Sequence, residues 1–168
     1  MTSEPRLAII GLGYVGLPLA ISFVEAGLTV EGIDAYAPRV AELAAGRSPI
    51  DDIADDRLKA ALARGLTVVE PAGAHLGEAD VVFVCVPTPI TKSKDPDLGP
   101  VLGAAGLIRG RLRAGQLIVL QSTTFPGTTN GPFREELERS GLVAGREDRK
   151  STRLNSSHTA TSRMPSSA

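Results

Sequence analysis

The sequence predicts an α/β fold in which a doubly wound parallel sheet forms a single domain, followed by a disordered C-terminal tail. Three observations support this: short β-branched runs recur, longer helical stretches separate them, and the end of the chain has no core-forming pattern. The 168 residues, 42% hydrophobic and 22% charged, suit one globular domain. A chain of this length buries enough surface for a core.

The predicted strands consist largely of consecutive apolar residues, as a sheet covered on both faces requires. They lie at 7–10, 28–33, 67–69, 81–86 and 117–120. Helices are predicted at 14–26, 38–45, 55–64, 97–113 and 131–140. Glycines mark four helix ends, at Gly27, Gly46, Gly65 and Gly141, and Asp95-Pro96-Asp97 offers a helix start. This alternation of strands and helices favours parallel pairing.

The character of the sequence changes near Arg146. Residues 150–168 include six serines and three threonines, but no aromatic residue, valine, isoleucine or acid. We therefore expect a domain at 1–146 and an unstructured tail at 147–168. The tail is either a natural flexible segment or a foreign one. We favour the foreign one, because the sequence from Arg149 onward resembles a translated sequencing adaptor.

The composition excludes several classes of partner. The net charge of −1 gives no broad basic field, so neither nucleic acid nor a membrane surface is favoured. Cys85 is the only cysteine, so there is no internal disulfide and no thiol cluster for zinc. The longest plain apolar stretch, 81–86, is far shorter than the roughly 18 residues that suggest a membrane span. A soluble, cytoplasmic protein is expected.

A glycine-rich turn follows the first predicted strand directly and opens the first predicted helix. It reads Gly11-Leu12-Gly13-Tyr14-Val15-Gly16. Gly11 permits the tight turn, Gly13 lets the backbone approach a pyrophosphate, and Gly16 lets the helix pack closely on the strand. The free amides of Leu12 to Val15 form the expected anion site, with Tyr14 and Val15 acting through their amides. In this context the turn indicates a Rossmann domain.

An acidic residue ends the second predicted strand. Asp34 lies roughly 20 residues beyond the turn, the spacing at which a carboxylate bonds the adenine ribose hydroxyls and favours NAD over NADP. Arg39 could meet an extra phosphate, but the Asp34 carboxylate would repel that group. The alternative is a packing turn with Asp34 as a helix cap.

Two further segments lie at predicted carboxyl ends of strands, 84–89 and 121–129. Together with the glycine turn and Ser48-Pro49-Ile50, they resemble the UDP-glucose/GDP-mannose dehydrogenase family over roughly residues 6–145. Residues 95–98, 115–120 and 122–129 are most similar to the UDP-N-acetylglucosamine 6-dehydrogenase branch. The UDP-glucose and UDP-N-acetylmannosamine enzymes are near neighbours. Gln121 departs from that branch, which usually carries glutamate there.

The resemblance implies oxidation of a sugar C6 alcohol to a carboxylate with two NAD, through a cysteine-bound thiohemiacetal and thioester. It makes Asp34 and Arg39 cofactor-binding residues and Thr88 a cofactor contact. It places Thr123 near the nicotinamide, where it helps hold the catalytic water. The alternative for both threonines is turn chemistry beside neighbouring prolines.

The resemblance also places the nucleophilic cysteine and its partner glutamate, lysine and asparagine beyond the matching part. We therefore expect an inactive, monomeric NAD-binding fragment of an enzyme of nucleotide-sugar metabolism and polysaccharide biosynthesis. The full-length enzyme is expected to be a homo-oligomer that takes a UDP-sugar. The alternatives are a stand-alone NAD-binding regulatory module and another Rossmann dehydrogenase, of hydroxyacyl-CoA or phosphogluconate type. The threonine segments argue against the second alternative.

Other residues of reactive types are expected to do no chemistry. Cys85 lies in a buried strand, which disfavours its thiolate. His75 and His158 lack ligand spacing and are interpreted as solvated loop residues, so no metal site is expected. The acidic pairs Asp51-Asp52 and Asp55-Asp56 are interpreted as helix caps and a solvated face. The segment holding Lys92 and Lys94 could contact a diphosphate or form a charged loop.

Overall fold

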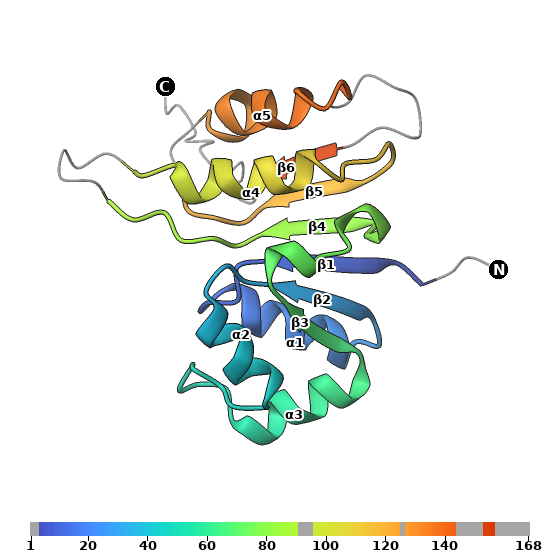
Figure 1. Ribbon diagram of the computed structural model, residues 1–168, viewed down its shortest axis with the longest axis vertical. Coiled ribbons are helices and arrows are strands. Elements are labelled where there is room, and N and C mark those ends of the chain that lie inside the picture. The colour runs from blue at the N-terminus through green and yellow to red at the C-terminus, as the bar shows by residue number, and fades with distance from the viewer. Residues whose placement is uncertain (1–3, 91–95, 125–126, 144–152, 157–168) are drawn as a thin grey trace, which may run out of the picture.

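The computed structural model describes residues 4–90, 96–124 and 127–143, and the backbone of 153–156. A parallel sheet with strand order β3-β2-β1-β4-β5-β6 runs through the molecule (Figure 1). Its strands are β1 (Arg6–Ile10), β2 (Thr29–Ile33), β3 (Leu66–Val69), β4 (Val81–Val84), β5 (Leu117–Leu120) and β6 (Arg153–Ser156). Every neighbouring pair is parallel, which confirms the predicted doubly wound fold.

Helices connect these strands. They are α1 (Gly16–Glu25), α2 (Ala37–Ala44), α3 (Asp55–Arg64), α4 (Gly99–Arg109) and α5 (Arg134–Glu138). The short turns η1 (Pro71–Gly73) and η2 (Leu76–Glu78) follow β3, and η3 (Thr129–Phe133) precedes α5. Figure 1 shows α2 and α3 toward the β3 end of the sheet, and α4 and α5 toward its other end. In the described residues, no helix is long and apolar enough to cross a membrane.

Two hydrophobic cores lie on opposite faces of the sheet. Ala8 and Ile10 of β1 belong to the core packed against α4 and α5. Leu7 and Ile9 belong to the core packed against α1 and α3. Side chains of a strand point alternately to the two faces, so a strand covered on both sides is apolar at most of its positions. The largely apolar runs of the sequence are explained by this arrangement.

Some helix boundaries differ from the prediction. Helix α4 begins at Gly99 instead of Asp97, because the Asp97 Oδ1 accepts the Gly99 amide at 2.8 Å and forms a turn before the helix. The proline of its first turn is therefore Pro100. The last predicted helix is divided into η3 and α5, since Gly131 has non-helical backbone angles. The four glycines predicted to end helices all have positive φ, which confirms their capping conformation.

Part of the tail departs from the predicted disorder. Arg153–Ser156 form β6 and pair in parallel with β5. Without that pairing β5 would be an edge strand, whose unpaired N–H and C=O groups can bond an extended backbone. The rest of 147–168 lies outside the described residues, as do His158, Lys92 and Lys94.

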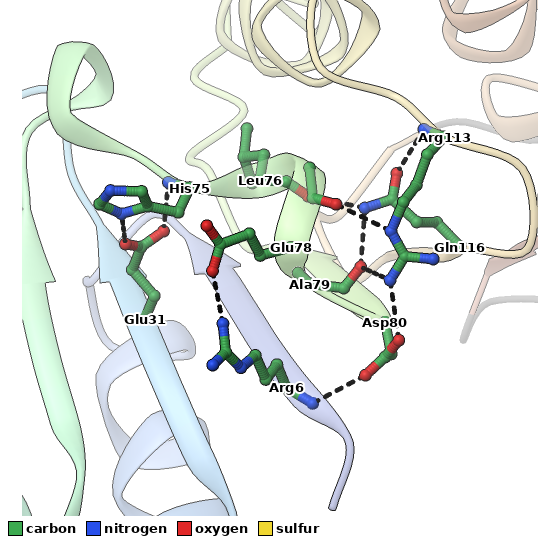
Figure 2. A network of polar contacts seen from close by, with 10 residues as sticks. Arg6, Glu31, His75, Leu76, Glu78, Ala79, Asp80, Arg113 and Gln116 are labelled. Carbon is green, nitrogen blue, oxygen red and sulfur yellow. Dashed lines mark hydrogen bonds and ion pairs between the residues drawn. The ribbon is translucent and has the colours of Figure 1, made fainter. Parts of the chain in front are cut away.

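A polar cluster fixes the amino ends of β1, β4 and β5 (Figure 2). Gln116 is buried, and its Nε2 donates to the carbonyls of Leu76 and Ala79 at 2.6 and 2.7 Å. Asp80 accepts the Arg6 amide at 3.0 Å and the Arg113 Nη2 at 2.8 Å. These two bonds, the amide first, hold the pKa of Asp80 below its usual value. This edge of the sheet is held together by its own polar groups.

Candidate dinucleotide-binding site

A pocket of about 1090 Å³ opens at the carboxyl ends of β1, β2, β4 and β5. Parallel sheets of this type bind ligands at this edge, next to the point where the strand order reverses. The volume is slightly above the usual range for a small-molecule site, about 300–1,000 Å³, so an extended ligand has room. The sequence-predicted residues that line it are Gly11, Gly13, Tyr14, Val15, Asp34, Arg39, Thr88 and Thr123.

The three glycines of the turn have different surroundings. Gly11 has φ +95°, and a Cβ there would lie 2.7 Å from the Cys85 carbonyl oxygen. A Cβ on Gly16 would lie 1.8 Å from the Gly11 carbonyl oxygen. The predicted tight turn and close helix packing are thus confirmed. A Cβ on Gly13 would meet no atom within 4 Å, so this position faces the open pocket.

The predicted anion site is smaller than expected, because the Leu12 amide is already bonded. It donates to the Asp34 Oδ2 at 2.8 Å. The Leu12 side chain is buried in the core and packs against Gly32, which leaves room for it because glycine has no side chain. The amides of Gly13, Tyr14 and Val15 have no acceptor within the described part of the chain. They precede α1, where the helix dipole favours an anion.

Asp34 connects the glycine turn to the loop after β2. Its side chain is 7% exposed. Besides the Leu12 amide, Oδ2 accepts the Arg39 Nη1 at 3.1 Å, and Oδ1 accepts the Tyr36 amide at 2.9 Å. The helix-cap alternative is not supported, since the first turn of α2 has no side-chain cap. A carboxylate has about four acceptor positions, so Oδ1 retains one for a ligand.

Hydroxyl groups replace backbone hydrogen bonds where β4 and β5 end. Pro87 and Pro89 follow β4 and have no N–H, so the ladder cannot continue through them. The Ser122 Oγ instead donates to the Val86 carbonyl at 2.8 Å, and it lies 3.3 Å from the Val84 carbonyl. Sequence reasoning missed this role of Ser122. A hydroxyl residue next to the end of β5, opposite a proline segment, is the signal that could have revealed it.

Thr88 and Thr123 come together from these two loops. The Thr88 hydroxyl donates to the Thr123 carbonyl, so Thr88 bonds backbone, as the turn-chemistry alternative expects. That backbone belongs to the neighbouring loop, however, and not to Thr88's own turn. Thr123 is exposed and lines the pocket. The two threonines therefore share one end of the site.

Cys85 lines the pocket, but its thiol is not reactive. The residue is 8% exposed, and burial raises the pKa of the thiol to about 11. At neutral pH the thiolate is scarce, so Cys85 is not a nucleophile. Its predicted place in the core is confirmed.

His75 differs from its interpretation as an isolated loop residue. Its side chain is exposed, but its Nδ1 lies 2.8 Å from the Glu31 Oε1 and its amide donates to Glu31 Oε2 at 2.8 Å (Figure 2). The hydrogen bond to Glu31 and the charge of Glu31 raise the pKa of His75. The sequence places these two residues far apart, so spacing could not reveal the pair.

The acidic pairs do not form a metal site. Asp55 accepts the Ser48 amide at 2.8 Å, and both Asp55 and Asp56 stand in the first turn of α3, where the helix dipole favours them. Neither side chain forms a capping hydrogen bond with the helix. Of the predicted helix cap, only the favourable interaction of the two charges with the helix dipole is present. Among the described residues, no group of three or more His, Cys, Asp or Glu could hold a metal.

The fold and this pocket are those of a dinucleotide-binding domain. Residues 5–146 match the UDP-glucose/GDP-mannose dehydrogenase family, NAD binding domain, and the chain belongs to that family. The predicted family and NAD cofactor are thereby confirmed.

Several relatives carry the family likeness. The chain is 38% identical over 138 residues to UDP-N-acetyl-D-glucosamine 6-dehydrogenase of Pseudomonas aeruginosa, covering 82% of this chain and 32% of the relative. It is 34% identical over 141 residues to UDP-N-acetyl-D-mannosamine dehydrogenase of Pyrococcus horikoshii, covering 83% and 34%. The solved UDP-glucose dehydrogenase of Pyrobaculum islandicum has a TM-score of 0.79 at 31% identity, covering 92% and 35%. The chain thus spans about a third of the length of these relatives.

Proposed function

We propose that this chain is the cofactor-binding part of a UDP-sugar 6-dehydrogenase. The reaction is oxidation of the C6 alcohol of UDP-N-acetylglucosamine, UDP-N-acetylmannosamine or UDP-glucose to a carboxylate. The observation that carries the proposal is the pocket, which joins free turn amides, the Asp34 carboxylate and the threonines Thr88 and Thr123 in a chain of this family. The names of the relatives support these three sugars.

The residues present fit NAD along the length of the pocket. The amides of Gly13, Tyr14 and Val15 suit the pyrophosphate, and Gly13 leaves the space for it. The free acceptor position of Asp34 suits a ribose hydroxyl, while the Asp34 charge and its pairing with Arg39 disfavour the additional phosphate of NADP. Gly11 and Gly16 shape the turn, and Leu12 orients Asp34.

Thr88 and Thr123 suit the nicotinamide end. Bound NAD supplies the hydride acceptor. Hydroxyl groups beside it add no charge that would oppose hydride transfer, and Thr123 is exposed to hold a water there. The nucleophile is not among these residues, because the only cysteine of the sequence, Cys85, is buried and protonated. We therefore propose that the chain alone binds NAD as a monomer without turnover, and that the cytoplasmic, homo-oligomeric enzyme includes further sequence.

Calorimetry and an activity assay test this proposal. We expect NAD to bind the 168-residue chain at least about tenfold more tightly than NADP. We expect no NADH formation with any of the three UDP-sugars. A longer protein that continues into the remaining family sequence should form NADH with at least one of them. Tighter binding of NADP, or oxidation of a UDP-sugar by the chain alone, would contradict the proposal.

A further inference from the structure

Tyr36 is an exposed aromatic residue at the edge of the pocket that neither the turn motif nor the family assignment explains. It is 60% exposed, although large hydrophobic side chains are mostly buried elsewhere in the described residues. Both Tyr36 and Arg39 line the pocket, and the Arg39 Cζ lies 5.8 Å from the centre of the Tyr36 ring. The guanidinium lies over the ring in a cation–π contact, and the exposure of Tyr36 leaves part of the ring accessible to a ligand.

The position of this ring is fixed by Asp34. The Tyr36 amide donates to the Asp34 Oδ1 at 2.9 Å, while the Arg39 Nη1 donates to Oδ2 at 3.1 Å. One carboxylate therefore holds both the backbone that carries the ring and the guanidinium that lies over it. Because Arg39 is paired with Asp34, the positive charge of Arg39 is largely compensated, and a phosphate is not needed to balance it.

We infer that Tyr36, supported by Arg39, stacks on the adenine base of the bound dinucleotide. Free amides, a carboxylate acceptor and an aromatic ring follow one another along this side of the pocket. A nucleotide presents the matching series of phosphate, ribose and base. Pro71, which follows the neighbouring strand β3, lines the same pocket and offers a second apolar surface. The inference rests on the proposed NAD binding and assigns the base to one residue of this chain.

Substitution at Tyr36 tests the inference. Stacking of an aromatic ring on a base contributes to the binding free energy. Tyr36→Ala should therefore weaken the binding of NAD and of ADP-ribose by the same factor, about tenfold. Tyr36→Phe keeps the ring and should bind both within about twofold of the original chain. Val143→Ala, at an exposed apolar residue outside the pocket, is the matched control and should bind normally. Thermal unfolding of each variant checks that the fold persists.

The sequence contains no tryptophan, so Tyr36→Trp places a single fluorescent reporter in the site. ADP-ribose and AMP should quench its emission, and nicotinamide mononucleotide should not. Equal quenching by nicotinamide mononucleotide would overturn the inference, as would a Tyr36→Ala chain that binds ADP-ribose as the original chain does. If the original chain bound neither NAD nor ADP-ribose, the proposed function would fail and the inference with it.

Discussion

Replacing Asp34 with alanine should reduce stability as well as NAD affinity, because this carboxylate bonds three N–H groups of the protein itself. The two Asp34 oxygens accept hydrogen bonds from the amides of Leu12 and Tyr36 and from the Arg39 guanidinium. The Arg39 side chain is 36% exposed, so water can replace that partner at modest cost. The Leu12 amide is buried, and leaving a buried donor unsatisfied costs about 1–3 kcal/mol. With the loss of the Tyr36 bond, we expect about 2–3 kcal/mol in total.

For a domain of this size that loss lowers the melting temperature by roughly 4–12 °C. Thermal and urea unfolding measure it, and calorimetry measures NAD binding on the same samples. Asp56→Ala is the matched control, because the Asp56 side chain is 99% exposed and loses only its interactions with the α3 dipole and Lys59, less than about 1 kcal/mol. An Asp34→Ala variant that melts with the original chain would refute the structural role, even if it no longer bound NAD.

Four further predictions concern the glycine turn, the β4–β5 loops and the His75 pair. Gly16→Ala should destabilise the fold by more than about 3 kcal/mol in urea unfolding, because its Cβ meets backbone at 1.8 Å. Gly13→Ala should melt normally and bind NAD at least about tenfold more weakly, because its Cβ enters only the pocket. Ser122→Ala should lower the free energy of unfolding in urea by about 1 kcal/mol, because the bond to the Val86 carbonyl is lost. It should also weaken the binding of NAD more than that of ADP-ribose, because it loosens the loops that carry Thr88 and Thr123. Equal weakening of both ligands would contradict this prediction. His75 has a raised pKa, so its pairing with Glu31 stabilises the fold fully below the unfolded pKa of about 6.5, and the benefit disappears as pH rises through the higher folded value. The stability difference between the original chain and Glu31→Gln should therefore be larger at pH 5.5 than at pH 9, and a pH-independent difference would refute it.

The strands could be predicted from the sequence because burial on both faces demands apolar residues at consecutive positions. The same rule gave β1 to β5 within a few residues. It could not find β6, since Arg153–Ser156 pair through backbone groups, and backbone pairing leaves no mark in side-chain composition. The start of α4 was misplaced because Asp97 bonds the Gly99 amide in a turn, a local alternative to helix for which the same residue types are suited.

The candidate site was predictable where its geometry is local. The glycine turn is such a case, since each glycine is required by atoms that the turn itself brings close. The interactions that were not foreseen join residues distant in the chain: Leu12 to Asp34 over 22 positions, Thr88 to Thr123 over 35, and His75 to Glu31 over 44. Such pairs depend on which strand ends become neighbours in the sheet, and residue spacing does not encode that.

The two edges of the sheet differ in how their polar groups are satisfied, and this difference supports the proposal that NAD binds at the carboxyl edge. At the amino edge, Gln116 and Asp80 are bonded to backbone and side-chain partners of their own cluster (Figure 2). At the carboxyl edge, the amides of Gly13 to Val15 have no acceptor in the described residues, and Asp34 keeps an acceptor position. Exposed amides at the start of a helix bond water, and a bound anion can take the place of that water. The phosphate and ribose hydroxyl of the proposed NAD would complete both groups at once, which is why we expect the carboxyl edge to favour a nucleotide over an apolar ligand of the same size.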